Sequence, residues 1–176
     1  MKPRIISFSG YQGSGKDTFA DYLCKEYNYK RLAFADTMKD MCSRYYKVPR
    51  HYFDDRTLKE TIYPEHGITP RDMCINLGSY MRSIDDNTFI NAVISQIELG
   101  CNYVISDCRK LQERDTLREK FNNNYISVYI KRFTDAPSNH PLEHEIKPWH
   151  CDYVLDNTNS PVNFKKLDEF LNVYKN

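Results

Sequence analysis

Short runs of β-branched and aromatic residues alternate along the chain with longer stretches whose apolar residues recur at helical spacing. The first short run, residues 4–9, ends at Gly10, which predicts a buried strand followed by a turn. Residues 16–27 come next, with Phe19 and Leu23 on one apolar stripe, and this pattern predicts an amphipathic helix. A strand, a glycine turn and a helix in this order are typical of α/β proteins.

The same alternation continues to the end of the chain. Thr69, Pro70 and Asp72 supply an N-cap, a first helical residue and an acidic first turn, so a helix is expected to begin there. Strands that alternate with helices predict a parallel sheet of about five strands, with right-handed crossovers and helices on both faces. Further strands are expected at 31–35, 102–107, 125–131 and 151–155, further helices at 36–46, 87–99, 112–121 and 162–174, and a short helix with loop at 49–67.

Residues 10–18, Gly-Tyr-Gln-Gly-Ser-Gly-Lys-Asp-Thr, are called the phosphate loop below and carry the strongest chemical signal. Glycines allow positive φ and close backbone approach, so successive N–H groups can turn toward phosphate oxygens, and the helix N-terminus adds partial positive charge. A lysine here can bridge the β- and γ-phosphates of ATP, and a following hydroxyl can reach Mg²⁺. The predicted ATP-binding residues are Gly10, Gly13, Ser14, Gly15, Lys16, Asp17 and Thr18, with Lys16 catalytic and Thr18 a magnesium ligand.

The phosphate loop departs from the standard pattern in one place. Asp17 stands directly after Lys16, where Ser or Thr is usual, and Thr18 follows. Nucleotide-kinase loops often have the form G-x-x-G-x-G-K-x-T, so the departure favours that class. The alternative is a strand-turn-helix whose glycines only make a tight turn, but the flanking elements favour phosphate binding. We therefore expect a P-loop NTPase fold, as a single domain over residues 1–176.

Asp107 closes the predicted strand of residues 102–107. P-loop enzymes usually carry an acidic residue at the end of a neighbouring strand, where it orients the waters of the metal ion. An aspartate at this place also commonly caps the following turn. We predict a catalytic and metal-binding role for Asp107. Arg109 follows on the loop, where its guanidinium could bind a phosphate or form an ordinary ion pair.

A phosphate-bearing acceptor needs cations, and the bidentate geometry of arginine suits a phosphate. Arg71 lies in the first turn of the helix that begins at Pro70, and Arg82 lies about three turns later on the same face. Lys39 is a further candidate on the helix of residues 36–46. We expect an acceptor region over about residues 36–90, and the predicted acceptor-binding residues outside the lid are Asp36, Lys39, Arg71, Arg82 and Arg109.

Residues from about 132 to 150 are polar and rich in proline and histidine, which indicates a lid. A lid brings positive charge to the transferring phosphoryl group and excludes water. Arg132 is the best candidate for that charge and is assigned a catalytic role. Glu143 could hydrogen-bond the edge of a base or pair with a cation of the lid, and Trp149, the only tryptophan, could face a substrate.

Bulk properties narrow the range of partners. A formal net charge of +1 gives no electrostatic reason to expect nucleic acid or a membrane as a partner. The longest apolar run near the start, residues 5–8, is too short for a signal peptide or a membrane span, so we expect a cytoplasmic protein. Six cysteines without a C-x-x-C pair indicate reduced thiols. A homodimer is an open expectation, since no interface can be recognised in the sequence.

Further stretches of the chain line up with a known group of enzymes. They are residues 34–39, 70–72 with 77–78, 105–109, 140–143 and 152–157. With the phosphate loop, they make nearly the whole chain resemble the deoxynucleoside monophosphate kinases of large DNA viruses and bacteriophages. The resemblance implies an α/β core, ATP with Mg²⁺, a deoxynucleoside 5′-monophosphate as acceptor and, for a viral protein, the host cytoplasm. It also implies that Lys16 and Thr18 contact the ATP phosphates and metal, that Arg71 contacts the acceptor, that Arg132 lies in the lid, and that Glu143 and Trp149 lie near the acceptor.

Two other functions stay open. A P-loop kinase of another small molecule, such as dephospho-coenzyme A, would phosphorylate a hydroxyl group and need a base, which Asp36 could supply. A nucleotide-dependent switch would hydrolyse ATP or GTP slowly, although the N-K-x-D segment that reads guanine is absent from the chain. The reaction products separate these functions, because a kinase gives ADP with a phosphorylated acceptor and a hydrolase gives free phosphate.

Overall fold

The computed structural model describes residues 2–132, 145–158, 162 and 164–174. Its contacts divide the chain into two compact units, each described here by itself. The sheet unit comprises residues 1–33 and 97–176, and the helical unit comprises residues 34–96. Among the described residues, no helix is both long enough and apolar enough to cross a membrane.

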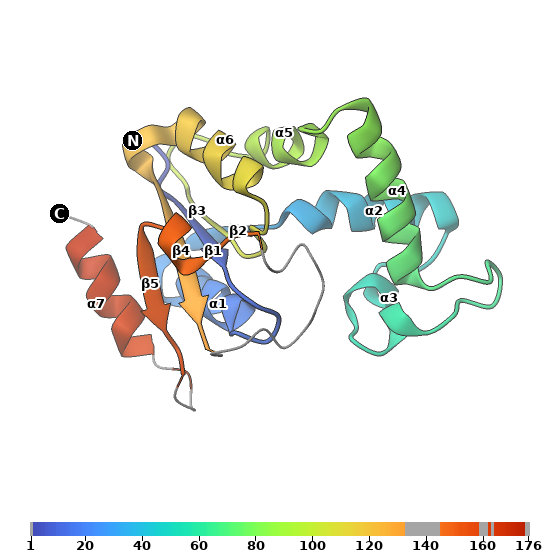
Figure 1. Ribbon diagram of the computed structural model, residues 1–176, viewed down its shortest axis with the longest axis horizontal. Helices are drawn as coiled ribbons and strands as arrows, with labels where there is room; N and C mark the ends of the chain where they lie inside the picture. Colours follow the sequence, from blue (N-terminus) through green and yellow to red (C-terminus); the bar gives the residue numbers. More distant parts are fainter. Residues whose placement is uncertain (1, 133–144, 159–161, 163, 175–176) are drawn as a thin grey trace. The chain divides into compact units, whose positions relative to one another are not determined.

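The sheet unit is built on five parallel strands, as the sequence predicts (Figure 1). Their order in the sheet is β2-β3-β1-β4-β5, so β1 lies at the centre. Chain order changes direction on the two sides of β1, and ligands of open α/β sheets bind at the carboxyl ends of the strands at such a point. The strands are β1 (Ile5–Ser9), β2 (Tyr29–Leu32), β3 (Asn102–Ile105), β4 (Tyr125–Lys131) and β5 (Tyr153–Asp156).

Helices cover both faces of this sheet. Successive side chains of a strand point to opposite faces, so Ile6 and Phe8 of β1 face one way and Ser7 the other. The Ile6 face packs against α1 (Lys16–Tyr27) and α7 (Phe164–Tyr174). On the other face, Arg118 of α6 (Leu111–Phe121) lies over the ring of Tyr125 at the start of β4. The sheet unit also contains the short 3₁₀ helices η2 (Asn122–Asn124), which precedes β4, and η4 (Pro148–His150), which precedes β5.

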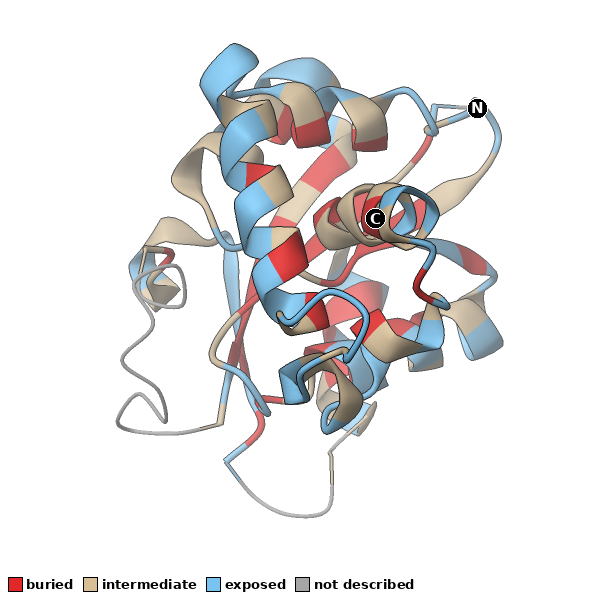
Figure 2. Cartoon of the chain, turned by 90° about the vertical axis from the view of Figure 1, so that its right-hand side faces the viewer, coloured by how far each residue is buried: buried red, intermediate tan, exposed pale blue. Residues whose placement is uncertain are grey.

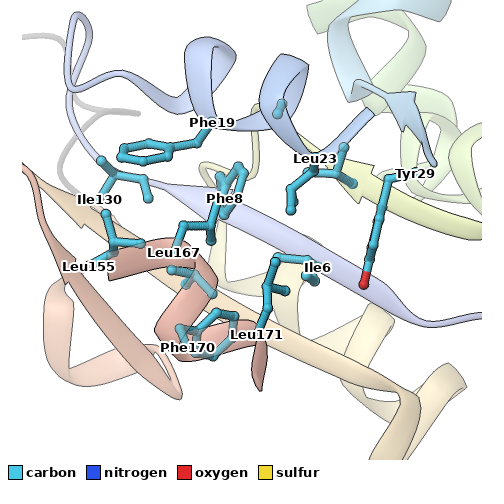
Figure 3. Close-up of a cluster of buried hydrophobic side chains, with 13 residues drawn as sticks. Ile6, Phe8, Phe19, Leu23, Tyr29, Ile130, Leu155, Leu167, Phe170 and Leu171 are labelled. Atoms are coloured by element: carbon cyan, nitrogen blue, oxygen red, sulfur yellow. The ribbon is translucent and has the colours of Figure 1, made fainter. Parts of the chain in front are cut away.

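The main core lies between the sheet and the helices α1 and α7, where side chains from both helices meet those of the strands (Figure 3). Phe19 and Leu23, the stripe predicted from the sequence, are fully buried there. Burying one such side chain contributes about 1.5–3 kcal/mol, so this cluster is a main source of stability for the sheet unit. Figure 2 shows buried residues both in the strands and at intervals along the helices, whose other positions are intermediate or exposed.

The helical unit contains α2 (Phe34–Tyr46), α3 (His51–Asp54), η1 (Leu58–Glu60), α4 (Pro70–Ile84) and α5 (Thr88–Ile94). Its own small core comprises Cys42, Val48, Phe53 and Met73. The start of α4 is as predicted: the Thr69 hydroxyl accepts from the Asp72 N–H, and the Asp72 carboxylate accepts from the Thr69 N–H. The predicted acceptor region, residues 36–90, falls within this unit.

Several predicted boundaries are wrong by a few residues. The strand expected at 31–35 is β2 at 29–32, because its pairing with β3 runs from Tyr29 opposite Asn102 to Leu32 opposite Ile105. The helix expected at 87–99 ends at Ile94, because the side chains of Ser95 and Gln96 donate to the Ala92 carbonyl and end the helical ladder. β3 ends at 105 rather than 107, β5 is displaced to 153–156, and α7 begins at 164.

Candidate phosphate-binding site

The phosphate loop leaves the carboxyl end of β1, the central strand, and runs into the first turn of α1. The Ser14 N–H donates to the Tyr11 carbonyl over 3.1 Å, which closes a turn inside the loop. The first helical bond follows at once, from the Phe19 N–H to the Gly15 carbonyl at 3.0 Å. The N–H groups that begin α1 therefore lie directly behind the loop, an arrangement that favours anions.

Two glycines of the loop are required by both conformation and space. Gly10 has φ +132°, and a Cβ atom there would lie 2.5 Å from the main-chain oxygen of Ile130 on β4. Gly15 has φ +101°, and its Cβ would lie 2.9 Å from Nδ2 of Asn157, just after β5. Both distances are too short for a side chain, so the ends of β4 and β5 lie against the loop. Gly13 also has a positive φ, +78°.

Lys16 is folded back over its own loop. Its side chain is buried, and Nζ donates to the main-chain oxygens of Gly10 at 2.6 Å and of Tyr11 at 2.8 Å. These carbonyl groups are neutral, whereas phosphate oxygens carry full charge and form stronger bonds with an ammonium. The lysine is therefore already positioned at the loop, where it can exchange carbonyl oxygens for phosphate oxygens.

The side chain of Asp17, the unusual residue after the lysine, points toward β2. Its carboxylate pairs with Arg31, which also donates to Asp21 and to the hydroxyl of Ser106. Asp17 therefore contributes its backbone, rather than its carboxylate, to the loop. Thr18 is exposed in the first turn of α1. Arg31 was not predicted as a site residue, because only the fold brings β2 beside the start of α1.

Asp107 lies beside the origin of the loop. β3 pairs in parallel with β1 as far as Ile105, its last residue, which lies opposite Ser7, and Asp107 follows two residues later. Beyond the strand the Cys108 N–H donates to the Phe8 carbonyl at 3.2 Å, one residue out of the β1–β3 register, so the segment with Asp107 stays beside the end of β1. Asp107 and the phosphate loop therefore share the carboxyl edge of the sheet, as the motif requires.

Glu113 organises the segment that carries Asp107 and Arg109. Its half-buried carboxylate accepts the N–H groups of Arg109 at 2.8 Å and Lys110 at 3.0 Å. Burial raises the pKa of Glu113 to about 7, which outweighs the opposing effect of these two hydrogen bonds. The Leu111 N–H donates to the Glu145 carboxylate at 2.8 Å. The side chain of Arg109 is exposed at the same edge.

Arg132 brings a second cation to the phosphate loop. It follows β4 directly, and its Nη1 donates to the Gly13 carbonyl at 3.3 Å. Trp149 lies in η4, with its side chain exposed and its ring edge-on to His150. Glu143, predicted near the acceptor, lies outside the described residues.

Asn157 contacts the loop and was missed by the sequence analysis. It is buried, and its Nδ2 donates to the Ser14 carbonyl over 2.8 Å. The two residues are 143 positions apart, and although Asn157 ends the stretch 152–157 that resembles the kinase family, no role was predicted for it. The sequence therefore contained no local signal for this contact.

The predicted acceptor residues Asp36 and Lys39 belong to one charge network of the helical unit. Arg50 donates to Asp36 at 2.8 Å and to Asp40 at 2.7 Å, and it also pairs with Asp54. Lys39 lies 2.9 Å from Asp54 and 4.0 Å from Asp36. Burial alone would raise the pKa of Asp54, but hydrogen bonds from Arg50 and Lys39 hold it below the usual value. Arg50 is the centre of this network, although no motif indicated it.

Arg71 and Arg82 both lie on α4 but have different partners. Nε of Arg71 is 3.1 Å from the Glu60 carboxylate, and the guanidinium of Arg82 lies over the ring of Phe89 at 5.5 Å. Eleven residues of α-helix separate them by about 16 Å along the axis. The structure therefore does not bring the two arginines together on one phosphate group, and Arg71, in the first turn, is the stronger candidate.

Comparisons with known proteins agree with this geometry. No protein-family model matches the chain. A relative from Acanthamoeba polyphaga mimivirus, named "Putative deoxynucleotide monophosphate kinase", is 27% identical over 187 residues, which cover 94% of this chain and 91% of the relative. A gluconokinase from Sinorhizobium meliloti 1021 is similar in structure, with a TM-score of 0.52 at 14% identity, covering 98% of this chain and 94% of that one. Shikimate kinase from Acinetobacter baumannii gives 0.50 at 12% identity, with coverage of 98% and 94%. The predicted fold is confirmed, because the parallel sheet with its flanking helices is shared with this gluconokinase and this shikimate kinase.

Proposed function

We propose that the chain is a kinase that transfers the γ-phosphoryl group of ATP to a deoxynucleoside 5′-monophosphate and so forms the diphosphate. The observation that carries the proposal is the buried Lys16 folded over a glycine loop at the carboxyl end of the central strand. Asp107 on the neighbouring strand end supplies the acidic partner that this chemistry needs. The similarity to the mimivirus protein supports the choice of acceptor.

The donor side of the reaction rests on residues of the sheet unit. Apart from the Ser14 N–H, which donates to the Tyr11 carbonyl, the backbone N–H groups of the phosphate loop and the first turn of α1 would hold the phosphates of ATP. Lys16 would bridge the β- and γ-phosphates. Arg132, already bonded to the Gly13 carbonyl, neutralises charge on the transferring group. In this reaction the protein positions the reactants and stabilises charge, and no covalent enzyme intermediate is required.

The Thr18 hydroxyl and the Asp107 carboxylate fit a magnesium ion, because Mg²⁺ prefers oxygen ligands and usually keeps several waters. When bound, Mg²⁺ neutralises charge on the β- and γ-phosphates. Asp107 would orient the waters of the ion, and the bond from the Cys108 N–H to the Phe8 carbonyl holds its segment beside β1.

The acceptor phosphate is assigned to Arg71 at the start of α4. Its present partner, Glu60, is an exposed carboxylate, so the ion pair is weak and open to exchange for a phosphate. A monophosphate oxygen is already ionised at neutral pH and needs no strong base. Asp36, the candidate base for a hydroxyl acceptor, shares its oxygen with Arg50 and Lys39. This network favours the monophosphate over a hydroxyl acceptor.

Measurement of ADP formation from ATP and Mg²⁺ tests the proposal, with the four common dNMPs, the matching NMPs and dephospho-coenzyme A as acceptors. Stimulation by one or more dNMPs, with the matching dNDP formed, is the expected result. Stimulation by dephospho-coenzyme A alone would assign another small-molecule kinase. ADP and free phosphate released at the same rate with every acceptor would indicate a hydrolytic switch and remove the acceptor roles of Arg71, Lys39 and Arg82.

A further inference from the structure

Asn157 stands just beyond β5, at the outer edge of the sheet, yet its side chain ends at the phosphate loop. Nδ2 donates to the Ser14 carbonyl over 2.8 Å, and both residues are buried. The same nitrogen occupies the space that a side chain on Gly15 would need. Asn157 therefore contacts two consecutive residues of the loop from one side.

This hydrogen bond determines the direction of a backbone donor. The peptide bond between Ser14 and Gly15 is planar, and in the trans form its C=O and N–H groups point in opposite directions. Because Asn157 holds the Ser14 oxygen, the Gly15 N–H points away from Asn157. Gly15 directly precedes Lys16, so this N–H belongs to the group of donors that the loop offers to phosphate.

We propose that Asn157 is a positioning residue for ATP, which fixes the Ser14–Gly15 peptide so that the Gly15 N–H is aimed at the β-phosphate side of the loop before the nucleotide binds. The inference rests on the proposed function in one respect, namely that the loop binds the phosphates of a nucleotide. It does not depend on which acceptor is phosphorylated.

The choice of asparagine at this buried place supports a specific role for the amide. Oδ1 of Asn157 has no hydrogen-bond partner among the described residues, although it is shielded from solvent. An unpaired buried polar atom costs free energy, and an apolar side chain of similar size would avoid this cost. The feature that an apolar side chain could not supply is the Nδ2 donor, because the Ser14 carbonyl can accept a hydrogen bond only from that nitrogen of the amide.

The backbone around Asn157 is held in place by its own contacts. The Asn157 N–H donates to the Lys131 carbonyl at 2.7 Å and continues the pairing of β5 with β4. The neighbouring Asp156 carboxylate accepts from the N–H of Thr158 at 3.0 Å and from its hydroxyl at 2.8 Å. Lys166 of α7 donates to the Asp156 carbonyl at 3.2 Å. Because this segment is already held in place, Asn157 can orient the phosphate loop without a loss of conformational freedom of its own when a nucleotide binds.

The test compares Mg²⁺-ADP binding, measured by calorimetry without any acceptor, between the wild-type chain, Asn157→Leu and Asn157→Asp. Both variants remove the donor, and both are expected to raise the Kd for ADP at least about tenfold, the scale of one lost buried hydrogen bond. In turnover assays the KM for ATP should rise while the KM for the acceptor stays within about twofold. If Asn157→Leu does not fold, Asn157→Ala replaces it under the same criterion.

Leu155→Val is the matched control, because this buried residue lies two positions earlier on β5 and its side chain belongs to the main hydrophobic core. It should lower the unfolding midpoint while the Kd for ADP stays within about twofold of wild type. A wild-type Kd in Asn157→Leu or in Asn157→Asp would overturn the inference and leave the proposed function intact. A tenfold loss in Leu155→Val would also overturn it, because any weakening of β5 would then suffice. Failure of the wild-type chain to bind ADP would instead refute the proposed function.

Discussion

The ammonium group of Lys16 lies 2.6 Å from the main-chain oxygen of Gly10, the residue at which β1 becomes the phosphate loop. A second bond joins the same ammonium group to the Tyr11 oxygen at 2.8 Å. The lysine thus bonds the backbone of the same loop that is proposed to enclose the phosphates, and we expect bound ATP to replace these neutral oxygens with charged ones.

Replacement of Lys16 should remove most of the activity. Lys16→Ala is expected to lower the turnover number on the order of 100-fold or more, as removal of one donor to the transition state does. ADP formation at saturating ATP and acceptor measures the effect. Lys25→Ala, an exposed lysine of the same helix, is the control and should keep wild-type turnover. A loss below tenfold in Lys16→Ala would exclude the assigned role.

Gly10 should tolerate no side chain. In Gly10→Ala, the new methyl group meets the Ile130 carbonyl at 2.5 Å in addition to the strain of a positive φ, and we expect a loss of about 2–5 kcal/mol in unfolding free energy. Gly100→Ala is the matched control, because Gly100 also has a positive φ but faces open space, so strain alone should cost about 1–2 kcal/mol. Urea unfolding measures both. Equal losses would show that contact with β4 does not restrict the loop.

Glu113 should make stability depend on pH. Its pKa is about 7 in the folded chain, against an ordinary glutamate value of 4.5, so the folded chain binds the proton more tightly than the unfolded chain does. The resulting stabilisation is fully present below pH 4.5 and is lost as the pH rises through 7, by about 3 kcal/mol in total. Glu113→Gln keeps an acceptor oxygen for the Arg109 N–H but does not titrate, so its unfolding free energy should lack this decline. Parallel pH profiles for the two proteins would contradict the prediction.

Arg71 should affect acceptor binding more than stability. Its pair with Glu60 is exposed and contributes less than about 1 kcal/mol, so Arg71→Ala should unfold near the wild-type urea concentration. Loss of a charge-assisted contact to the acceptor phosphate should raise the KM for the dNMP at least about tenfold and leave the KM for ATP unchanged. Arg44→Ala, exposed on α2, is the control. An unchanged acceptor KM in Arg71→Ala would remove this residue from the proposed site.

The elements that were predicted best are those whose signals lie within a few adjacent residues. The start of α4 follows from the reciprocal bonds of Thr69 and Asp72, which need no other part of the chain. The strand ends were predicted less well, because β2 and β5 end where their partners stop pairing, and the partners are distant in sequence. The end of α5 depended on side-chain bonds from Ser95 and Gln96 that compete with the helix.

By itself, the sequence determined the order of strands and helices, the phosphate loop and the residue types of its chemistry, because glycine conformation, capping and hydrophobic spacing act between near neighbours. Only the tertiary structure decided which distant groups meet that loop. Asn157 reaches Ser14 because the register of β5 against β4 places the residue after β5 beside the loop. Glu113 acquires its raised pKa because the folded chain removes its carboxylate from water. Asp17 faces Arg31 because β2 lies beside the start of α1. Such contacts depend on packing between segments far apart in the chain, which local residue preferences do not encode.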